Sequence, residues 1–555
     1  MQIQLNTIAK WCVFAGVFIS GVDAGFAQGN PEEQVGKQPA IKVQTSLVMV
    51  PAIVTDRSGK PIADLKEEDF EVRRDGKIQK IGYFKHVQTN AEVMKPAAAP
   101  SDGFTNAVES GNQRLTIFML DFLNSSFTEQ RAAREELLKF LSKSLDVKEP
   151  VSLLALDQTG VKVIHDFTMN PAVLAEALKN VTERATSKDK PQSNAVEDTY
   201  RMVAGWNSRS ASRSAAMAQS RLDTLRNAEN HQSLDRNARV AATLEALCAI
   251  GEAFSGIPGR KSMVWATGGI PFEIGDAAMF GLRDSGLLPA YEQAWRALNR
   301  ANIAVYPLDV EQLVNPAFVG AEIGRPLPQH ARTNLTVTNM ERFAEVTGGK
   351  FCDQREDAES CFREAANDSS DYYLLGIYEN SVDLKPGWRK LSVKVSRPDV
   401  RVRSRAGYYV GSVQDEKRQI KDEMEIALSS PFDYTAIPLA VRWSLTKEVR
   451  AKGERRVDFM FTLAPGAATL DESASNHLSL EFAALAKDAK GTPRGSFSQN
   501  VEGHVTQPVA ADIQKNGVNF PGNMDLPPGE FILVFVVRDN LSRQIGTVSA
   551  VIKVP

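Results

Sequence analysis

The six histidines are the first residues to consider for catalysis or metal binding, because imidazole serves in both roles. None of them has the His-Glu-x-x-His spacing that places two metal ligands on one face of a helix. They are His86, His165, His231, His330, His477 and His504. The sequence also lacks the Gly-x-Ser-x-Gly motif that presents a nucleophilic serine on a sharp turn. These patterns favour a protein that is not an enzyme.

Two other segments have compositions typical of ligand sites. Gly256–Ser262 has the residue types of a phosphate-binding loop, but its spacing differs, and it precedes a predicted strand instead of following one. A turn between a helix and a strand explains it better. A group of acidic side chains has the charge to attract calcium, although a solvated loop is the simpler interpretation. These side chains are Asp353, Glu356, Asp357 and Glu359.

The bulk composition is that of an ordinary globular protein. The chain has 555 residues, of which 43% are hydrophobic and 24% are charged. Single hydrophobic cores stop growing at about 250 to 300 residues, so we expect three or four domains. The formal net charge of -3 supplies no overall positive field for nucleic acid or anionic lipid. We therefore expect neither as a partner.

The N-terminus predicts export. Residues 1–27 have the order of a secretory signal peptide: Lys10, the apolar stretch Trp11–Gly21, and small residues at Gly25–Ala27. We expect a mature chain that begins near Gln28 and is located in the periplasm or outside the cell. No later segment has the length of a membrane span.

The cysteines leave two interpretations open. Cys352 and Cys361 are close enough in the sequence to pair in an oxidising compartment, while Cys248 lies on a predicted helix face and would stay single. Three unpaired, largely buried thiols explain the same sequence.

The order of apolar patterns predicts distinct folded regions. Residues 41–90 alternate like short strands and predict a small β domain, which a linker follows at 95–111. After a charged helical connector near 414–426, residues 427–555 predict an antiparallel β-sandwich.

Between these regions, residues 112–410 predict an α/β domain. Apolar runs alternate with helical patterns there, as in a doubly wound, mostly parallel sheet. A polar insertion at about 183–237 is either a helical excursion or a loop. The predicted core strands are Leu115–Leu120, Val151–Leu156, Val161–Ile164, Met263–Ala266 and Ile303–Leu308.

Several motifs occur in an order that resembles bacterial VWFA-related proteins, of the von Willebrand factor type A-like family. The resemblance covers about residues 40–410 and does not include the C-terminal sandwich. It implies a Rossmann-type α/β domain that binds a protein or a cell-surface ligand. The motifs are Val43–Phe84, Leu115–Ser126, Gly259–Trp265, Phe343–Gly349, Asp371–Tyr378 and Arg405–Tyr408.

The resemblance also implies a metal-ion-dependent adhesion site, in which an Asp-x-Ser-x-Ser loop binds Mg²⁺ or another divalent cation. Here Asp121 and Ser125 match, Leu123 replaces the first serine, and Asn124 is a candidate carbonyl donor. The later aspartate of the family is missing, since the sequence reads Thr267-Gly268-Gly269. Asp121 and Ser125 are thus the metal candidates of a degenerate site. Alternatively, they cap the following helix.

Two functions follow as hypotheses. In the first, the chain is an exported, non-catalytic adhesion protein whose central domain binds another protein. In the second, the degenerate site binds no ion, and the chain is a structural scaffold of a cell-envelope assembly.

Overall fold

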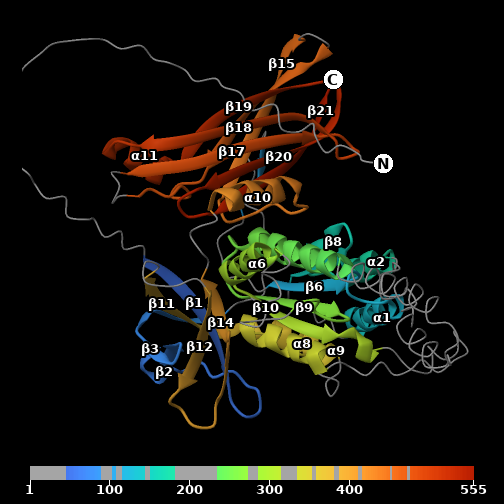
Figure 1. Ribbon diagram of the computed structural model, residues 1–555, viewed down its shortest axis with the longest axis vertical. Coiled ribbons are helices and arrows are strands. Elements are labelled where there is room, and N and C mark those ends of the chain that lie inside the picture. The colour runs from blue at the N-terminus through green and yellow to red at the C-terminus, as the bar shows by residue number, and fades with distance from the viewer. Residues whose placement is uncertain are drawn as a thin grey trace, which may run out of the picture. The chain divides into compact units, whose positions relative to one another are not determined.

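The structure is a computed structural model, in which the described residues form five sheets with helices between them (Figure 1). The chain is therefore a mixed α/β protein with several sheets. The predicted signal peptide, nearly all of the insertion at 183–237 and the acidic segment at 353–357 lie outside the described residues. The described residues are 45–88, 103–107, 115–143, 150–181, 234–272, 286–313, 334–352, 358–380, 387–410, 416–449, 453–471 and 476–555.

The central sheet contains the five predicted core strands, which the structure confirms. They are β6 (Leu115–Asp121), β7 (Val151–Asp157), β8 (Gly160–Thr168), β9 (Lys261–Thr267) and β10 (Ile303–Asp309). Their spatial order is β8-β7-β6-β9-β10, and neighbours are parallel except for β7 and β8. All strands but the edge strand β8 are buried along their whole length, as expected of strands covered on both faces.

Helices cover both faces of this sheet (Figure 1). The helices here are α1 (Phe127–Lys143), α2 (Pro171–Lys179), a helix at 234–254, α6 (Leu288–Arg300), α8 (Asn334–Thr347) and α9 (Ala358–Asp368), with the short η2 at Val310–Leu313. Alternate side chains of β6 face different cores. Ile117 packs in the core of the 234–254 helix, α6 and α8, whereas Phe118 packs in the core of α1, α2 and α9.

The N-terminal strands share a sandwich with strands from much later in the sequence. Its elements are β1 (Thr45–Thr55), η1 (Glu67–Asp69), β2 (Phe70–Arg74), β3 (Lys77–Gln79), β4 (Ile81–Gln88), β11 (Asp371–Asn380), β12 (Gly387–Val395), β13 (Arg401–Ser404) and β14 (Gly407–Val410). They form two sheets, β13-β1-β11-β4 and β14-β12-β2-β3. The first sandwich therefore combines residues 45–88 with 371–410, whereas the sequence predicted a small β domain at 41–90 and an α/β domain at 112–410.

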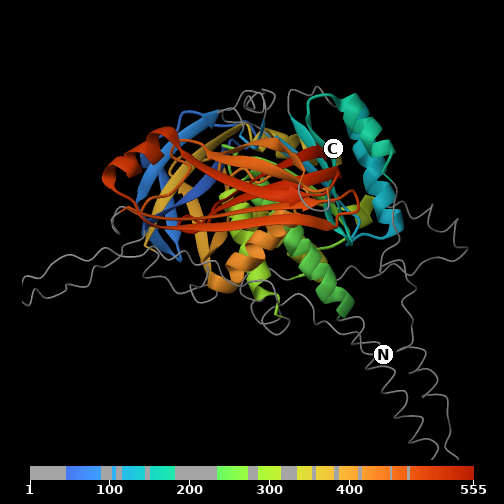
Figure 2. The ribbon, with the colours of Figure 1, turned by 90° about the horizontal axis from the view of Figure 1, so that it is seen from above.

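The C-terminal region forms a second sandwich around one core. Its elements are β15 (Leu439–Val449), β16 (Arg455–Leu463), β17 (His477–Lys487), β18 (Pro493–His504), α11 (Gln507–Asn516), β19 (Val518–Leu526), β20 (Gly529–Asp539) and β21 (Ile545–Val554). The sheets are β19-β16-β15-β5 and β18-β17-β20-β21. Figures 1 and 2 show α11 at one end of these strands.

One strand of the second sandwich comes from the predicted linker. β5 (Gly103–Thr105) pairs with β15, and the buried side chain of Asn106 donates to the carbonyl of Ile437 at 2.9 Å. The side-chain oxygen Oδ1 of Asn106 accepts from the Leu439 N–H at 2.7 Å. The Pro, Ala, Ser and Gly residues of 95–111 favour a linker, and a three-residue strand is too short to show the alternation that would oppose this interpretation.

Candidate functional site

The carboxyl ends of β6 and β9 lie side by side in the middle of the central sheet. From β6 the chain continues to β7 and β8 on one side, and it later adds β9 and β10 on the other. Open α/β sheets bind ligands where the strand order reverses in this way. Asp121 ends β6 and Thr267 ends β9. The predicted site residues are therefore at the position where such a fold places a ligand.

Asp121 is 2% exposed, and its carboxylate accepts hydrogen bonds from several groups. The backbone N–H groups of Leu123 and Asn124 donate to Oδ1 at 3.1 and 2.9 Å. The Asn124 amide nitrogen lies 3.0 Å from Oδ2 and 3.3 Å from Oδ1. Trp265 Nε1 and Thr267 Oγ1 donate to Oδ2 at 3.0 and 2.7 Å. Burial raises the pKa of Asp121, and the hydrogen bonds from Thr267, Asn124 and Trp265 oppose this rise.

The loop after β6 is part of the core. The N–H groups of Phe122 and Leu123 both donate to the carbonyl of Leu156, at the end of β7. Leu123, which stands where the family has a serine, packs in the core with the 234–254 helix. Ser126 and Glu129 form a capping box, with the Ser126 N–H 2.8 Å from Glu129 Oε2. Helix α1 is thus capped by Ser126, not by the two metal candidates.

Asn124 and Ser125 connect this loop to neighbouring segments. The Gly268 N–H donates to Ser125 Oγ at 2.9 Å. The Asn124 amide also donates to Thr243 Oγ1 at 3.1 Å, and Thr243 donates to the carbonyl of Arg239 at 2.7 Å. The cluster therefore links β6, the segment after β9 and the 234–254 helix.

These contacts do not fit a Mg²⁺ ion held by Asp121. A hard cation needs oxygen lone pairs that face it. N–H and O–H donors instead surround both carboxylate oxygens, and Asn124 turns its amide nitrogen toward Asp121. Among the described residues, no group of three or more His, Cys, Asp or Glu side chains could hold a metal. Asp121 and Ser125 do lie together, but each accepts hydrogen bonds from the chain itself.

Two further aspartates at the same edge of the sheet were missed in the sequence. Asp157 ends β7 and Asp309 ends β10, and each follows a leucine, as Asp121 does. Asp157 accepts from Thr159 and from Lys162 Nζ, the latter at 2.8 Å. Burial alone would raise the pKa of Asp157, but these hydrogen bonds hold this pKa below its usual value. The repeated Leu-Asp at strand ends is the signal that identifies all three.

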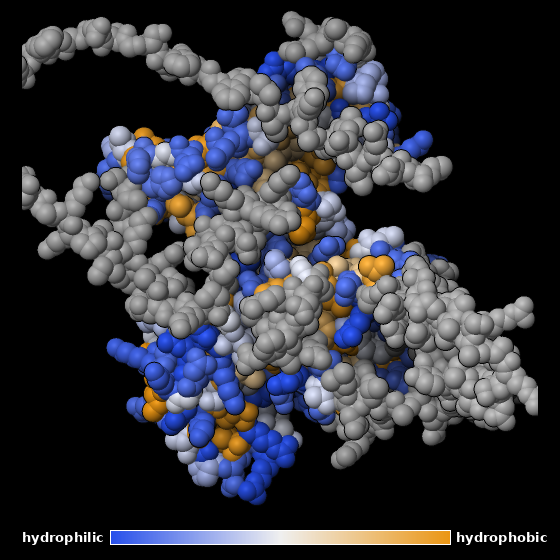
Figure 3. Space-filling model, viewed as in Figure 1, coloured by the Kyte–Doolittle hydropathy of each residue, from blue (hydrophilic) through white to orange (hydrophobic). Residues whose placement is uncertain are grey.

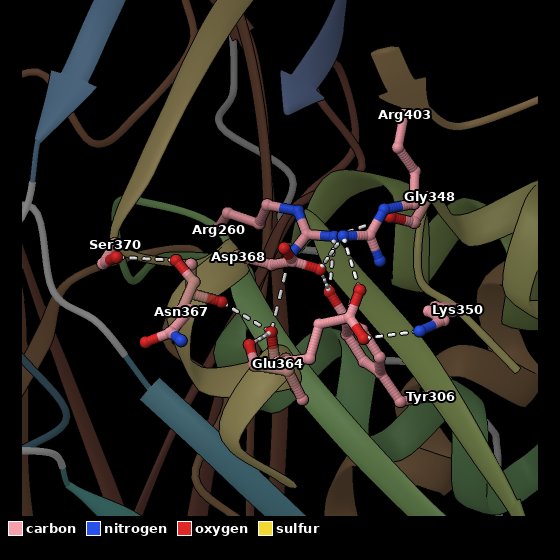
Figure 4. A network of polar contacts seen from close by, with 12 residues as sticks. Arg260, Tyr306, Gly348, Lys350, Glu364, Asn367, Asp368, Ser370 and Arg403 are labelled. Atoms are coloured by element: carbon pink, nitrogen blue, oxygen red, sulfur yellow. Dashed lines mark hydrogen bonds and ion pairs between the residues drawn. The ribbon is translucent and has the colours of Figure 1, made fainter. Parts of the chain in front are cut away.

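A second buried polar cluster joins the central sheet to the first sandwich (Figure 4). Arg260 is 1% exposed and donates to Tyr306 Oη at 3.1 Å. Tyr306 donates to Asp368 at the end of α9, and Arg403 of β13 lies 2.6 Å from the same carboxylate. The Arg260 N–H donates to Tyr372 Oη of β11 at 2.9 Å. Burial raises the pKa of Tyr306, which therefore stays a neutral donor.

Three of the motifs that carry the family resemblance meet at this second cluster through Arg260, Gly348 and Tyr372. Arg260 belongs to Gly259–Trp265, and it donates at 2.6 Å to the carbonyl of Gly348, in the Phe343–Gly349 motif. Arg405 begins the last motif and donates to Asn299 Oδ1 at 2.9 Å. These residues position the central domain against the first sandwich, whereas the Asp121 loop lies at the carboxyl edge of the sheet.

The segment Gly256–Ser262 is the predicted turn between a helix and a strand. The helix ends at 254 and β9 begins at Lys261. Lys261 is 1% exposed, and its Nζ donates to the carbonyls of Ile257 and Gly259 at 2.6 and 2.9 Å. Burial lowers the pKa of Lys261 to about 7. The lysine therefore stabilises the turn from its buried side.

The cysteines adopt the first of the two predicted arrangements. Cys352 and Cys361 form a disulfide bond, and Cys248 is a free, buried thiol on the 234–254 helix. Among the described residues, no helix combines the length and apolar character needed to cross a membrane.

Comparisons with known proteins were made for the sequence and for the fold. No family model and no curated protein matches the sequence. Two solved structures are distant neighbours. The N-terminal domain of TFIIH p34 shares 13% identity, with 45% of this chain and 95% of that domain covered and a TM-score of 0.19. The open conformation of the pilus adhesin SpaC from Lactobacillus rhamnosus GG shares 8% identity, with 90% and 58% covered and a TM-score of 0.25. At these TM-scores, neither neighbour identifies the family or the function of this chain.

Proposed function

We propose that the chain is an exported, non-catalytic binding protein whose central domain is of the von Willebrand A type and binds another protein without a divalent ion. The strand order β8-β7-β6-β9-β10 supports this type of domain, because it puts the Asp121 loop at the reversal of strand order. The motifs Leu115–Ser126 and Gly259–Trp265 include the neighbouring strands β6 and β9.

We infer binding without a divalent ion from the hydrogen bonds that Asp121 accepts. Its two oxygens are surrounded by donors from Asn124, Trp265 and Thr267. The loop is therefore held in one conformation by the chain itself. A partner is recognised by the shape and the apolar side chains around this loop, and not through a shared cation.

One such side chain is Phe127, the first residue of α1. It is 45% exposed, immediately after the loop that Asp121 organises. Exposed aromatic residues on a rigid support are typical anchors of protein interfaces. We therefore place the partner contact at Phe127, at the carboxyl edge of the central sheet.

Export is supported by the disulfide between Cys352 and Cys361, because such bonds persist in oxidising compartments. The predicted signal peptide at residues 1–27 gives the route. The proposed location is the periplasm or the cell exterior.

The test is cross-linking of the tagged protein in the cells that produce it, followed by identification of the cross-linked proteins. We expect the same partners in EDTA and in Mg²⁺. Phe127→Asp should reduce their recovery about tenfold or more, since a buried interface aromatic contributes at least about 1.4 kcal/mol. Aspartate is tolerated in the first turn of a helix, so the variant should fold.

Val509→Asp is the matched control. Val509 is 46% exposed and also lies in the first turn of a helix, α11, but in the second sandwich. Its substitution should leave recovery unchanged. Recovery that requires Mg²⁺, or that is equally sensitive to both variants, would contradict the proposal. So would turnover by the purified protein in a panel of hydrolase substrates.

The envelope scaffold is a second candidate, and the second buried cluster favours it. The central domain is joined to the first sandwich by contacts among Arg403 and the buried residues Arg260, Tyr306 and Asp368. A scaffold of this kind would co-purify with envelope components whether or not Phe127 is replaced. The Phe127→Asp variant therefore separates the two candidates.

A further inference from the structure

Among the described residues, two strand edges on one side of the first sandwich have no partner strand. β4 is the last strand of the sheet β13-β1-β11-β4, and β3 is the last strand of the sheet β14-β12-β2-β3. Only Lys80 separates them in the sequence, so both edges lie on the same side. Unpaired edges present free N–H and C=O groups to other chains.

This side also presents apolar side chains to solvent. Ile78 of β3 is 63% exposed, Tyr83 of β4 is 38% exposed and Tyr378 of β11 is 58% exposed. The Tyr378 ring lies over Gly82 of β4, where a Cβ atom would be 2.1 Å from the ring. Figure 3 shows apolar side chains reaching the surface among hydrophilic ones. The β4 edge is therefore flanked by aromatic surface.

An acidic depression adjoins the start of β4. It has a volume of about 470 Å³ and is lined by Glu67, Glu68, Phe70, Gln79 and Ile81. Glu68 lies 3.9 Å from Lys66, whereas the Glu67 side chain makes no ion pair with a described residue. Further along β4, Lys85 is exposed and is likewise without an ion pair among the described residues. One edge thus carries both an acidic group and a basic group.

We propose that this edge is the interface of a homodimer, in which β4 pairs antiparallel with β4 of a second copy about a two-fold axis at Tyr83. In an antiparallel pair centred on residue 83, residue 85 of one copy stands opposite residue 81 of the other. Lys85 of each copy then lies beside the depression that holds Glu67 of its partner. Because of the two-fold symmetry, this ion pair occurs twice in the interface, as expected of an isologous contact.

The aromatic side chains contribute to the same contact. Tyr83 meets its own copy across the axis, and cross-strand aromatic pairs stabilise sheets. An interface built on one short strand is small, so we expect a dissociation constant on the order of micromolar.

The test is sedimentation equilibrium of the full chain at concentrations on both sides of about 10 µM. We expect a reversible monomer–dimer equilibrium. Lys85→Glu and Glu67→Lys should each weaken it about tenfold or more, because like charges then face each other across the axis. The double variant Glu67→Lys/Lys85→Glu should restore dimerisation, since the exchanged charges again complement each other.

Lys553→Glu is the control, because Lys553 lies on β21, another edge strand, in the second sandwich. It should leave the equilibrium unchanged. A single Tyr83→Cys substitution should cross-link two copies on oxidation, whereas Gln88→Cys should not, because the axis separates the two copies of residue 88.

The competing role of Lys85 is to keep the edge monomeric, as charged residues on edge strands often do. A chain that stays monomeric at every concentration, or a dimer that Lys85→Glu does not weaken, overturns the proposal. Faster cross-linking of Gln88→Cys than of Tyr83→Cys overturns the register.

Discussion

Lys261 shows what burial does to a single side chain. Its ammonium contacts the carbonyls of Ile257 and Gly259, and burial lowers its pKa to about 7. Between this value and the ordinary value of 10.5, the unfolded chain binds a proton that the folded chain does not. The free energy of unfolding should therefore rise with pH, by up to about 1.4 kcal/mol per pH unit. Below about pH 7 both states are protonated, and this contribution is constant.

The measurement is urea unfolding of the wild type and of Lys261→Met between about pH 7 and about pH 9. The variant loses two hydrogen bonds and should be less stable throughout, but its stability should rise less with pH. Lys490→Met, at an exposed turn, should keep the wild-type slope. If the free energy of unfolding changed equally with pH in all three proteins, Lys261 would not be the source of the rise.

At the level of single residues, the sequence predicts only part of the candidate site. Asp121 and Ser125 stand in a recognisable loop, and Ser126 and Glu129 have the three-residue spacing of a capping box. The Trp265 indole and the Thr243 hydroxyl were not predicted, because they come from segments far from Asp121 in the sequence. A local pattern shows which residue carries charge, but not which distant donors surround it.

Among the elements, the 234–254 helix contacts two different parts of the protein. It contacts the Asp121 loop through Thr243, and its last turn contacts the second sandwich. There the Gly256 N–H donates to Thr435 Oγ1 at 3.1 Å, and Thr435 donates to the carbonyl of Ala253 at 2.7 Å. A Cβ atom at Gly256 would lie 1.8 Å from the Thr435 carbonyl oxygen.

Gly256→Ala should therefore destabilise the protein by about 1–3 kcal/mol, because the added methyl group forces the helix end away from Thr435. Gly503→Ala is the matched control, since a Cβ atom there meets nothing within 4 Å, and it should change stability by less than about 0.5 kcal/mol. Both values are obtained from chemical denaturation. A loss of the same size in both variants would mean that the Thr435 contact is not tightly packed.

At the level of elements, the sequence predicted strands well and their partners poorly. Buried parallel strands such as β6 and β10 are apolar runs that end in Leu-Asp, and these are visible locally. The pairing of β1 with β11 depends on contacts between residues that are far apart in the chain. Alternation in 41–90 therefore predicted a separate small domain, although half of the strands of that sandwich come after residue 370.

At the scale of the whole molecule, the order of the strands along the chain predicts which segments can fold alone. The central domain is inserted between β4 and β11, and these two strands are paired neighbours, with Gln88 opposite Asp371. Replacing residues 89–370 by an Asn-Gly turn should convert β4 and β11 into a hairpin. We expect this shortened chain, ending after β14, to keep β-sheet circular dichroism and to unfold cooperatively.

Residues 45–88 alone are the comparison for this experiment. They lack β11 and β13, the partners of β1, and should be unfolded. A folded 45–88 fragment would support the prediction from the sequence that this region is a separate small β domain. An unfolded shortened chain would show that the sandwich depends on the central domain.

The same insertion determines how the protein would respond to tension. A force that pulls on the chain before β1 and after β14 is carried by the first sandwich, where β1 is hydrogen bonded to β11 and β13. The residues between β4 and β11 bear no load until those strands separate. The Asp121 loop would thus keep its shape under mechanical stress, and extension in a single-molecule experiment should begin with rupture of the sandwich, before the central domain unfolds.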